Sequence, residues 1–140
     1  MNYLLDTCAV AEFVRDEPDP TFLEWLDSCD EDRLHISVLT LGEIQKGVAK
    51  LPRSKRKEML RRWLHDDLVG RFTGRILPVT QDVALMWGRL QGDAERRGRK
   101  LPAIDALIAA TALVFGGVVV TRDQEHLKRC DVPVLAPWSS

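Results

Sequence analysis

The sequence contains only three cysteines, and none of them lies at the spacing of a metal-binding pair. Cys8, Cys29 and Cys130 form an odd set without a CxxC motif, which argues against a disulfide framework and against a zinc site. Free thiols are typical of a reducing compartment, so we expect the protein to be cytoplasmic. The N-terminus also lacks the basic segment and apolar stretch of a signal peptide.

Long hydrophobic runs are absent as well. The longest stretch without a charge, Ala106 to Thr121, is shorter than the roughly 20 apolar residues that a membrane span needs. The pair Gly116-Gly117 also interrupts it, so we expect no association with a membrane. The sequence has no internal repeat, low-complexity segment or linker, and its 140 residues predict a single domain over 1–140.

The sequence also lacks a large excess of either positive or negative charge, because its formal net charge is −1. The charges are nevertheless unevenly distributed. Residues 1–33 hold ten Asp and Glu against two Arg, whereas residues 50–62 hold seven Lys and Arg against one Glu. A second basic cluster comprises Arg96, Arg97, Arg99 and Lys100. Each basic run alone is most simply a solvated helix face, but together the two signs suit a polyanion held near bound cations.

The pattern of apolar residues predicts strands that alternate with helices. Strands are expected over 2–6, 33–39, 75–79, 117–121 and 132–135. Helices are expected over 8–15, 20–29, from Thr40 onward, 54–68, from Thr80 to Gly98, and 103–115. This alternation predicts an α/β fold, a three-layer α/β/α sandwich with a mostly parallel central sheet. In such a sheet the functional crevice lies at the carboxyl ends of the strands.

Four carboxylates are placed to meet at that edge. Asp6 and Asp123 follow two expected strands, Asp105 heads a helix that leads into one of them, and Glu43 begins the helix after the second strand. Four clustered carboxylates would repel one another unless a cation neutralised them. Oxygen ligands select Mg²⁺ or Mn²⁺ over zinc, and such an ion makes water easier to deprotonate. This chemistry suits hydrolysis of phosphodiester bonds.

Each carboxylate also has a purely structural explanation. Asp6 and Asp123 could each cap the helix that follows. Glu43 could complete a capping box with Thr40, in which the third residue of a helix bonds back to its cap. Asp105 could simply be a negative charge in the first turn of its helix, where the helix dipole favours it.

Four segments, in this order, resemble the motifs of PIN-domain ribonucleases: "LLDTCAV", "SVLTLGEIQKGV", "AIDALIAATAL" and "VVVTRD". Within that family the sequence is most similar to the VapC and FitB toxins of bacterial toxin–antitoxin modules. The segments "GRILPV" and the terminal "APW" resemble the FitB-type subgroup. The likeness runs along nearly the whole chain and preserves the order of the motifs.

The resemblance implies a Mg²⁺- or Mn²⁺-dependent endoribonuclease that hydrolyses RNA with a metal-activated water. It also implies a homodimer that is inhibited by a cognate antitoxin in a type II module. Carried over to this sequence, it assigns the catalytic and metal-binding roles to Asp6, Glu43, Asp105 and Asp123, with Thr7 and Thr121 in support.

Two positions depart from the family pattern. Many relatives have Asn where this sequence has Cys8. Many also have Asn at the position of Asp123 and an acid three residues later, where this sequence has His126. The three histidines show no triad or ligand spacing, and we assign them no role.

Contacts with the RNA backbone are expected from basic residues outside the acidic quartet. The candidates are Arg53, Lys55 and Arg56 on the basic helix, with Arg75 and Arg122 nearer the crevice. The sequence leaves open the RNA target and whether one metal ion or two are bound.

The competing interpretation is a non-catalytic α/β binding or signalling module, whose carboxylates cap helices or bind Mg²⁺ without cleaving nucleic acid. A receiver domain needs an adjacent acidic pair near the first strand, and Asp6 is followed by Thr7 and Cys8. A haloacid-dehalogenase-type phosphatase needs a second Asp where Cys8 stands.

Overall fold

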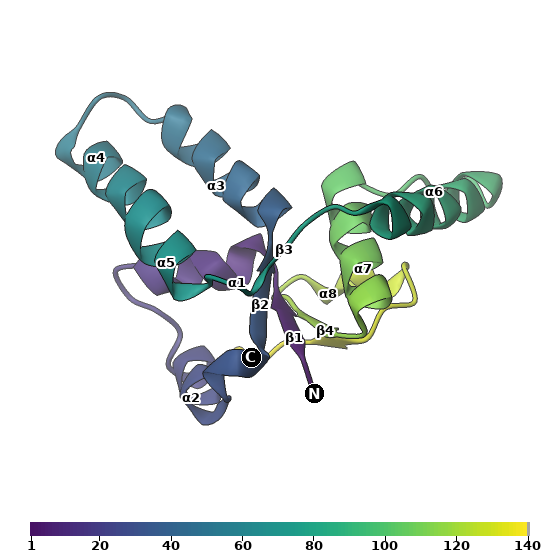
Figure 1. The fold of residues 1–140 in the computed structure, drawn as a ribbon, viewed down its shortest axis with the longest axis horizontal. Helices are drawn as coiled ribbons and strands as arrows, with labels where there is room; N and C mark the ends of the chain where they lie inside the picture. The colour runs from purple at the N-terminus through teal and green to yellow at the C-terminus, as the bar shows by residue number, and fades with distance from the viewer. Residues whose placement is uncertain (140) are drawn as a thin grey trace.

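The computed structural model describes residues 1–139 and has a five-stranded parallel sheet at its centre (Figure 1). Its neighbouring strands all run parallel, in the order β3-β2-β1-β4-β5. The strands are β1 (Tyr3–Leu5), β2 (Leu34–Ser37), β3 (Ile76–Leu77), β4 (Val118–Val120) and β5 (Val134–Leu135). The predicted α/β fold with a parallel sheet is therefore confirmed.

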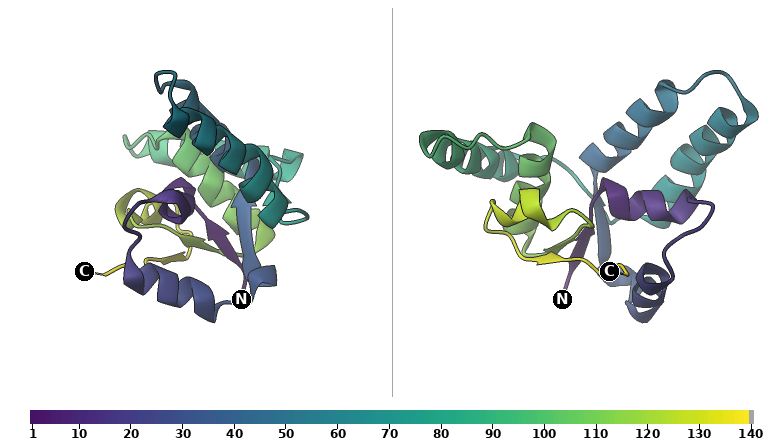
Figure 2. Two further views of the ribbon diagram at one scale, coloured as in Figure 1. Left: turned by 90° about the vertical axis from the view of Figure 1, so that its left-hand side faces the viewer. Right: turned by 180° about the vertical axis from the view of Figure 1, so that it is seen from behind.

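Helices cover both faces of this sheet. In Figure 1, α1 to α5 lie on one side of the strands and α6 and α7 on the other, and the reverse view in Figure 2 agrees. The helices are α1 (Thr7–Ala11), α2 (Pro20–Ser28), α3 (Val38–Ala49), α4 (Lys55–Arg62), α5 (Val69–Arg71), α6 (Gln81–Arg96), α7 (Ala103–Phe115) and α8 (Gln124–Lys128). Among residues 1–139, no helix has the length and apolar character needed to cross a membrane.

The core lies in two layers, one on each face of the sheet. Successive side chains of a strand point to opposite faces, so neighbouring residues of β1 enter different layers. Leu5 packs with Phe22 and Phe72 under α1, α2 and α5, whereas Leu4 packs with Ala109 of α7 on the other side. Both leucines are fully buried. A strand buried on both faces must be apolar throughout, which explains the run at the start of the sequence.

Side-chain caps set where the helices begin. Thr80 caps α6 by accepting a hydrogen bond from Val83, as expected from the sequence. Ser37 caps α3 through a bond from the Leu39 amide at 3.0 Å, so α3 begins at Val38. The predicted start at Thr40 was therefore wrong, because the stronger cap lies earlier in the chain.

The helix expected over 54–68 is also longer than predicted. α4 continues through a π-helical stretch, Trp63–Leu68, and then into α5, which ends at Arg71. A π-helical stretch widens the helix by one residue per turn, and such stretches occur often at functional sites.

The order of the strands determines where the functional edge lies. From β1 the sheet extends through β2 and β3 on one side and through β4 and β5 on the other. The crevice at the carboxyl ends of β1 and β4 is therefore the point where the strand order reverses, which is where open α/β sheets bind ligands. The Asp6 amide donates to the Val120 carbonyl across this junction at 3.1 Å.

Candidate active site

Asp6 stands directly after β1 and caps the helix α1 that follows. Its Oδ1 accepts a hydrogen bond from the Ala9 amide at 3.0 Å, so Asp6 does cap α1 as the structural explanation held. Burial raises the pKa of this carboxyl above its usual value, while the nearby Thr121 hydroxyl, the Ala9 amide and the Cys8 thiol oppose that shift. The cap and the Cys8 thiol both use Oδ1, at the crevice beyond β1 and β4, which we call the mouth.

Glu43 is held by a hydroxyl from another element. The Thr7 Oγ1 of α1 donates to Glu43 Oε1 of α3 at 2.5 Å and lies 3.3 Å from the buried Thr40 Oγ1. Since α3 begins at Val38, Glu43 is not the third residue of the helix and cannot form a capping box with Thr40. The structural explanation for Glu43 was therefore wrong, and its carboxylate is free to serve the mouth.

Asp105 lies close enough to the other three predicted carboxylates for their charges to affect its pKa. It is the third residue of α7, as predicted, and its side chain is 38% exposed. Burial raises the pKa of its carboxyl, and the negative charges of Glu43, Asp6 and Asp123 raise it further. The nearby His126 ring lowers it in part. Asp105 therefore lies within electrostatic range of each of the other three predicted acids.

Asp123 follows β4 at the outer rim of the mouth, with 63% of its side chain exposed. Its amide donates to Thr121 Oγ1 at 3.2 Å, and the same hydroxyl donates back to the Asp123 carbonyl. The side chain makes no cap bond to α8. Thr121 thus fixes the turn that carries Asp123, and the capping explanation for Asp123 does not hold.

His126 is the residue that the sequence analysis missed. Its Nδ1 lies 3.3 Å from Asp123 Oδ2 and 3.6 Å from Asp105 Oδ2, so the ring bridges two carboxylates of the mouth. A signal was available, because a residue three positions after Asp123 faces the same side of the helix expected there. No ligand or triad spacing marked it.

Cys8 takes the place of the usual amide and behaves as a neutral thiol. Its Sγ donates to Asp6 Oδ1 at 3.1 Å and accepts from the Arg122 amide at 3.4 Å. Burial and the charge of Asp6 raise the pKa of the thiol to about 12. At neutral pH it therefore stays protonated and supports Asp6 as a donor rather than as a thiolate ligand.

The basic candidates separate into two groups. Arg122 comes two residues after β4, and its backbone amide donates to the Cys8 thiol beside the mouth. Arg53, Lys55 and Arg56 lie where α3 turns into α4, away from the sheet (Figure 1).

The structure places Arg75 away from the crevice, contrary to the prediction from the sequence. It precedes β3 and therefore lies at the amino edge of the sheet, opposite the mouth. Its Nη1 donates to the carbonyls of Glu31 and Leu34 at 2.6 and 2.7 Å, and its Nη2 pairs with the Glu31 carboxylate. The expectation that Arg75 lies near the crevice was wrong, because its guanidinium ties β2 to β3 from the far side.

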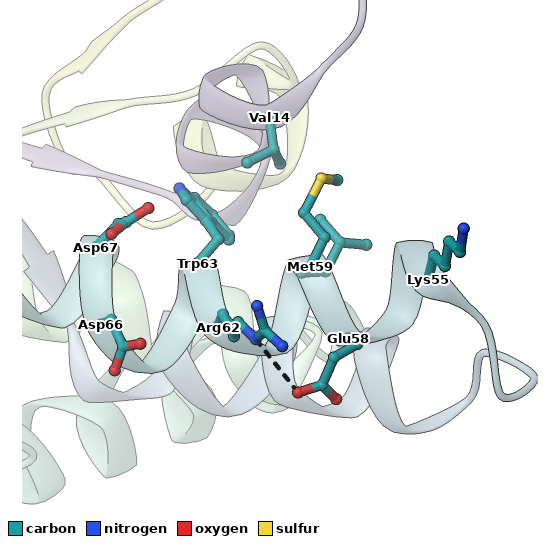
Figure 3. A pocket seen from close by; sticks show the side chains of 9 residues that line it. Val14, Lys55, Glu58, Met59, Arg62, Trp63, Asp66 and Asp67 are labelled. Atoms are coloured by element: carbon teal, nitrogen blue, oxygen red, sulfur yellow. Dashed lines mark ion pairs between the residues drawn. The ribbon is translucent and has the colours of Figure 1, made fainter.

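A groove leads away from the mouth along α1 and α4. One cavity of about 690 Å³ is lined by Val14, Met59, Leu60 and Trp63 together with charged residues of α4 and the π-helical stretch (Figure 3). A second cavity, of about 390 Å³, shares Val14, Leu60 and Trp63 with the first and extends to Thr7. We call the two together the α1–α4 groove. It therefore ends at the hydroxyl that holds Glu43.

Residues 3–132 match the PIN domain family. The chain belongs to that family. This PIN domain is 36% identical over 135 residues to Toxin FitB of Neisseria gonorrhoeae. The aligned region covers 96% of this chain and 97% of that protein. The chain is 30% identical over 135 residues to the VapC ribonuclease Y4jK of Sinorhizobium fredii, which covers 96% of each. The crystal structure of FitAcB from Neisseria gonorrhoeae contains a chain that matches with a TM-score of 0.91 at 35% identity, covering 99% of both chains.

The PIN domain's acidic mouth suits a hydrated divalent ion. Within residues 1–139, no three His, Cys, Asp or Glu side chains stand close enough to surround one ion directly. Mg²⁺ does not need such a cage, since it keeps several waters and binds proteins through one or two carboxylates. The donor set is rich in carboxylate oxygen, and the mutual repulsion felt at Asp105 is what a bound cation would relieve. The residues therefore fit a Mg²⁺ or Mn²⁺ ion.

Proposed function

We propose that this protein is a Mg²⁺- or Mn²⁺-dependent endoribonuclease and the toxin of a type II toxin–antitoxin module. The observation that carries the proposal is that Asp6 and Asp123 follow β1 and β4 at the point where the strand order reverses. His126 lies against both Asp123 and Asp105, and Thr7, next to Asp6, bonds Glu43. The printed names of two relatives, a toxin and a VapC ribonuclease, point to the same activity. The free state of all three cysteines suits the cytoplasm, where we place this activity.

In this proposal Asp6 and Asp105 hold the ion, because Asp6 directly follows β1 and Asp105 lies on α7, two firmly buried elements. When bound, the ion supplies a Lewis acid that lowers the pKa of a water and offsets negative charge on the phosphoryl oxygens. Asp123, on the rim, completes the site. The nonbridging oxygens of the RNA phosphate face this mouth while the strand crosses it.

Glu43 is the base in this scheme. Its Oε1 accepts the Thr7 hydroxyl, and that bond fixes the orientation of the carboxylate. The second oxygen is then positioned to accept a proton from the attacking water. The water adds to phosphorus in line with the 3′-oxygen, the bond from phosphorus to that oxygen breaks, and the 3′-oxygen leaves as a hydroxyl. The products therefore carry a 5′-phosphate and a 3′-hydroxyl, and the 2′-hydroxyl of the RNA takes no part in the cleavage.

The direct test is to cut RNA with the purified protein, with and without Mn²⁺, and to sequence the new 5′ ends. We expect cleavage only with the metal, 5′-phosphate ends, and no cleavage by Asp105→Asn. Products with a 2′,3′-cyclic phosphate would contradict the water mechanism. Metal-independent cleavage would contradict the metal site, and full activity of Asp105→Asn would remove that residue from it.

The α1–α4 groove is the surface we propose for the antitoxin. It is long and apolar along Val14, Leu60 and Trp63, which suits the apolar side of a helix. It also ends beside the acidic mouth, where an Arg or Lys of the antitoxin could pair with the carboxylates and exclude the ion. A homodimer belongs to the same proposal. Leu85, Val114 and Phe115 are apolar and exposed on α6 and α7, and they offer a second copy a surface apart from the groove.

The proposed contacts of the RNA backbone are with Arg122 at the mouth and with Arg53, Lys55 and Arg56 on the turn before and the start of α4. A charged side chain that contacts phosphate strengthens binding to all sequences alike. We therefore expect these residues to set affinity and not the choice of cleavage site.

A further inference from the structure

A second charged cluster, of opposite sign to the mouth, surrounds a small cavity beside it. This cavity of about 230 Å³ lies between the end of α6, the loop before α7 and the end of α8. Among residues 1–139, none of its four basic residues makes an ion pair with an acidic side chain. We call it the basic pocket; its charged lining is Arg97, Arg99, Lys128, Arg129 and Asp131.

The loop that carries two of these cations is held firmly. Gly98 ends α6 with a φ of 73°, a left-handed conformation that favours glycine. The Arg99 amide then donates back to the Ala94 carbonyl at 2.8 Å. The buried side chain of Gln91 bonds both the amide and the carbonyl of Leu101, at 3.1 and 2.8 Å. The backbone beneath Arg97 and Arg99 is therefore fixed before any ligand arrives.

The opposite wall is fixed by a turn at the end of α8. Asp131 has a φ of 54°, and its amide donates to the Lys128 carbonyl at 3.2 Å. Cys130, which precedes Asp131 in this turn, is buried and packs in the core layer under α7, so it anchors the turn. Lys128 and Arg129 are thus presented from a tight reversal of the chain, and four like charges face one small space.

The basic pocket adjoins the acidic mouth through two elements. Leu101 comes four residues before Asp105 at the start of α7, and Arg129 comes three residues after His126 of α8. Three residues of helix span about 5 Å. His126 in turn lies 3.6 Å from Asp105, so the pocket and the mouth share the junction of α7 and α8. The basic pocket is therefore built on α8, the helix that carries His126, and on the loop that leads into α7 and Asp105.

We propose that the basic pocket binds one phosphate group of the RNA strand next to the bond that is cleaved. The inference rests on the proposed ribonuclease function and names a binding site for its substrate. The cavity of about 230 Å³ has room for a phosphate, and its lining of four cations and one carboxylate favours an anionic group. The planar guanidinium of Arg97 or Arg99 can bind phosphate oxygens in pairs. Asp131 alone opposes the four cations.

The site also explains how an acidic mouth can hold a polyanion. Four carboxylates repel the phosphates that approach them, and the repulsion must be offset by cations nearby. A phosphate bound in the pocket on one side of the mouth would hold the RNA strand in place while the scissile phosphate faces Asp6 and Asp105.

The test measures binding of a short single-stranded RNA to the full chain with Asp105→Asn, in Mg²⁺, so that the RNA stays intact. Arg97→Gln/Arg99→Gln and Lys128→Gln/Arg129→Gln are added separately to this background. The matched control is Arg33→Gln/Arg96→Gln, which removes the same charge outside the pocket. We expect both pocket variants, but not the control, to bind several-fold more weakly. For each lost phosphate contact, the slope of log affinity against log salt should fall by about 0.7.

A scan with methylphosphonate, which makes one phosphate of the RNA neutral at a time, locates the contact. One position should weaken binding to the Asp105→Asn chain and have no effect on the pocket variants. Equal losses for pocket and control variants, or no such position, would overturn the proposal. Equal competition by an acidic peptide, without any sensitive phosphate, would overturn it in favour of a protein-docking surface. A sensitive phosphate in a protein that cuts no RNA would refute the ribonuclease and leave the pocket standing.

Discussion

The Thr7 hydroxyl of α1 donates to Glu43 Oε1 of α3 at 2.5 Å, across two elements that are 36 residues apart in sequence. A hydroxyl that bonds a carboxylate at this distance is a charge-assisted donor, which is stronger than a neutral one. The same oxygen of Thr7 lies 3.3 Å from the buried Thr40, so the threonine pair sets the position of the acid. The orientation of the proposed base therefore depends on a residue that need not touch RNA.

We expect Thr7→Val to lower the rate of RNA cleavage about 10- to 100-fold, the usual effect of removing a partner that orients a catalytic or metal-binding group. The loss of one hydrogen bond should reduce the free energy of unfolding by only about 1 kcal/mol. Thr7→Ser keeps the hydroxyl and should restore most of the rate. Cleavage rates and thermal melts of the three proteins provide the measurement, and equal rates for Val and Ser would show that the bond has no role.

Asp105 should make the metal-free protein less stable at neutral pH. Its pKa is raised in the fold, so ionisation is less favourable in the folded chain than in the unfolded chain. The penalty is absent below the unfolded pKa of about 4, grows as the pH rises through the folded value, and is complete above it. Asp105→Asn should therefore raise the melting temperature at pH 7 without metal, and the gain should vanish at low pH.

With a divalent ion bound, the parent should instead melt at a higher temperature than Asp105→Asn. Mn²⁺ at 100 times its dissociation constant stabilises a single site by about 2.7 kcal/mol, and Asp105→Asn should gain much less. Melting curves with Mn²⁺ and with a chelator, at pH 7 and near pH 3, measure both effects. Asp27→Asn, an exposed site on α2, is the control. If Asp105→Asn melts below the parent in chelator at pH 7, the carboxylates of the mouth do not repel one another as described.

The sheet and the positions of Asp6 and Asp105 in the fold were predictable because their signals are local and agree with one another. The run before Asp6 and the valines before Thr121 could only be buried strands, and parallel strands bring their carboxyl ends together. Asp105 was predictable because its helix is apolar on every side and must enter the core.

What the sequence could not show depends on the choice between neighbouring signals and on contacts across the fold. Ser37 and Thr40 are both good caps, and only the path of the chain after β2 decides that Ser37 is used. The pairing of Thr7 with Glu43 needs the packing of α1 on α3, which no spacing encodes. The position of Arg75 could have been predicted, because a residue before a parallel strand lies at the edge opposite the crevice.

Arg75 should matter for stability and not for RNA. Its side chain is 16% exposed and bonds three backbone carbonyls and the Glu31 carboxylate at the far edge of the sheet. We expect Arg75→Ala to reduce the free energy of unfolding by about 2 kcal/mol, since the carbonyl of the buried Leu34 loses a charged donor. Its affinity for RNA should equal that of the parent. Arg122→Ala should show the opposite pattern, and weaker RNA binding by folded Arg75→Ala would restore Arg75 as a backbone contact.

The α1–α4 groove can be closed without disturbing the core. Gly47 of α3 lines it, and a Cβ added at this position would meet no atom within 4 Å. We expect Gly47→Trp to fold and to bind the cognate antitoxin at least tenfold more weakly, because the indole occupies the apolar surface of the groove. Glu24→Trp, an exposed site on α2, places the same side chain outside the groove and should bind the antitoxin normally. Calorimetry with the purified antitoxin measures the difference, and parental affinity of Gly47→Trp would mean that the antitoxin binds elsewhere.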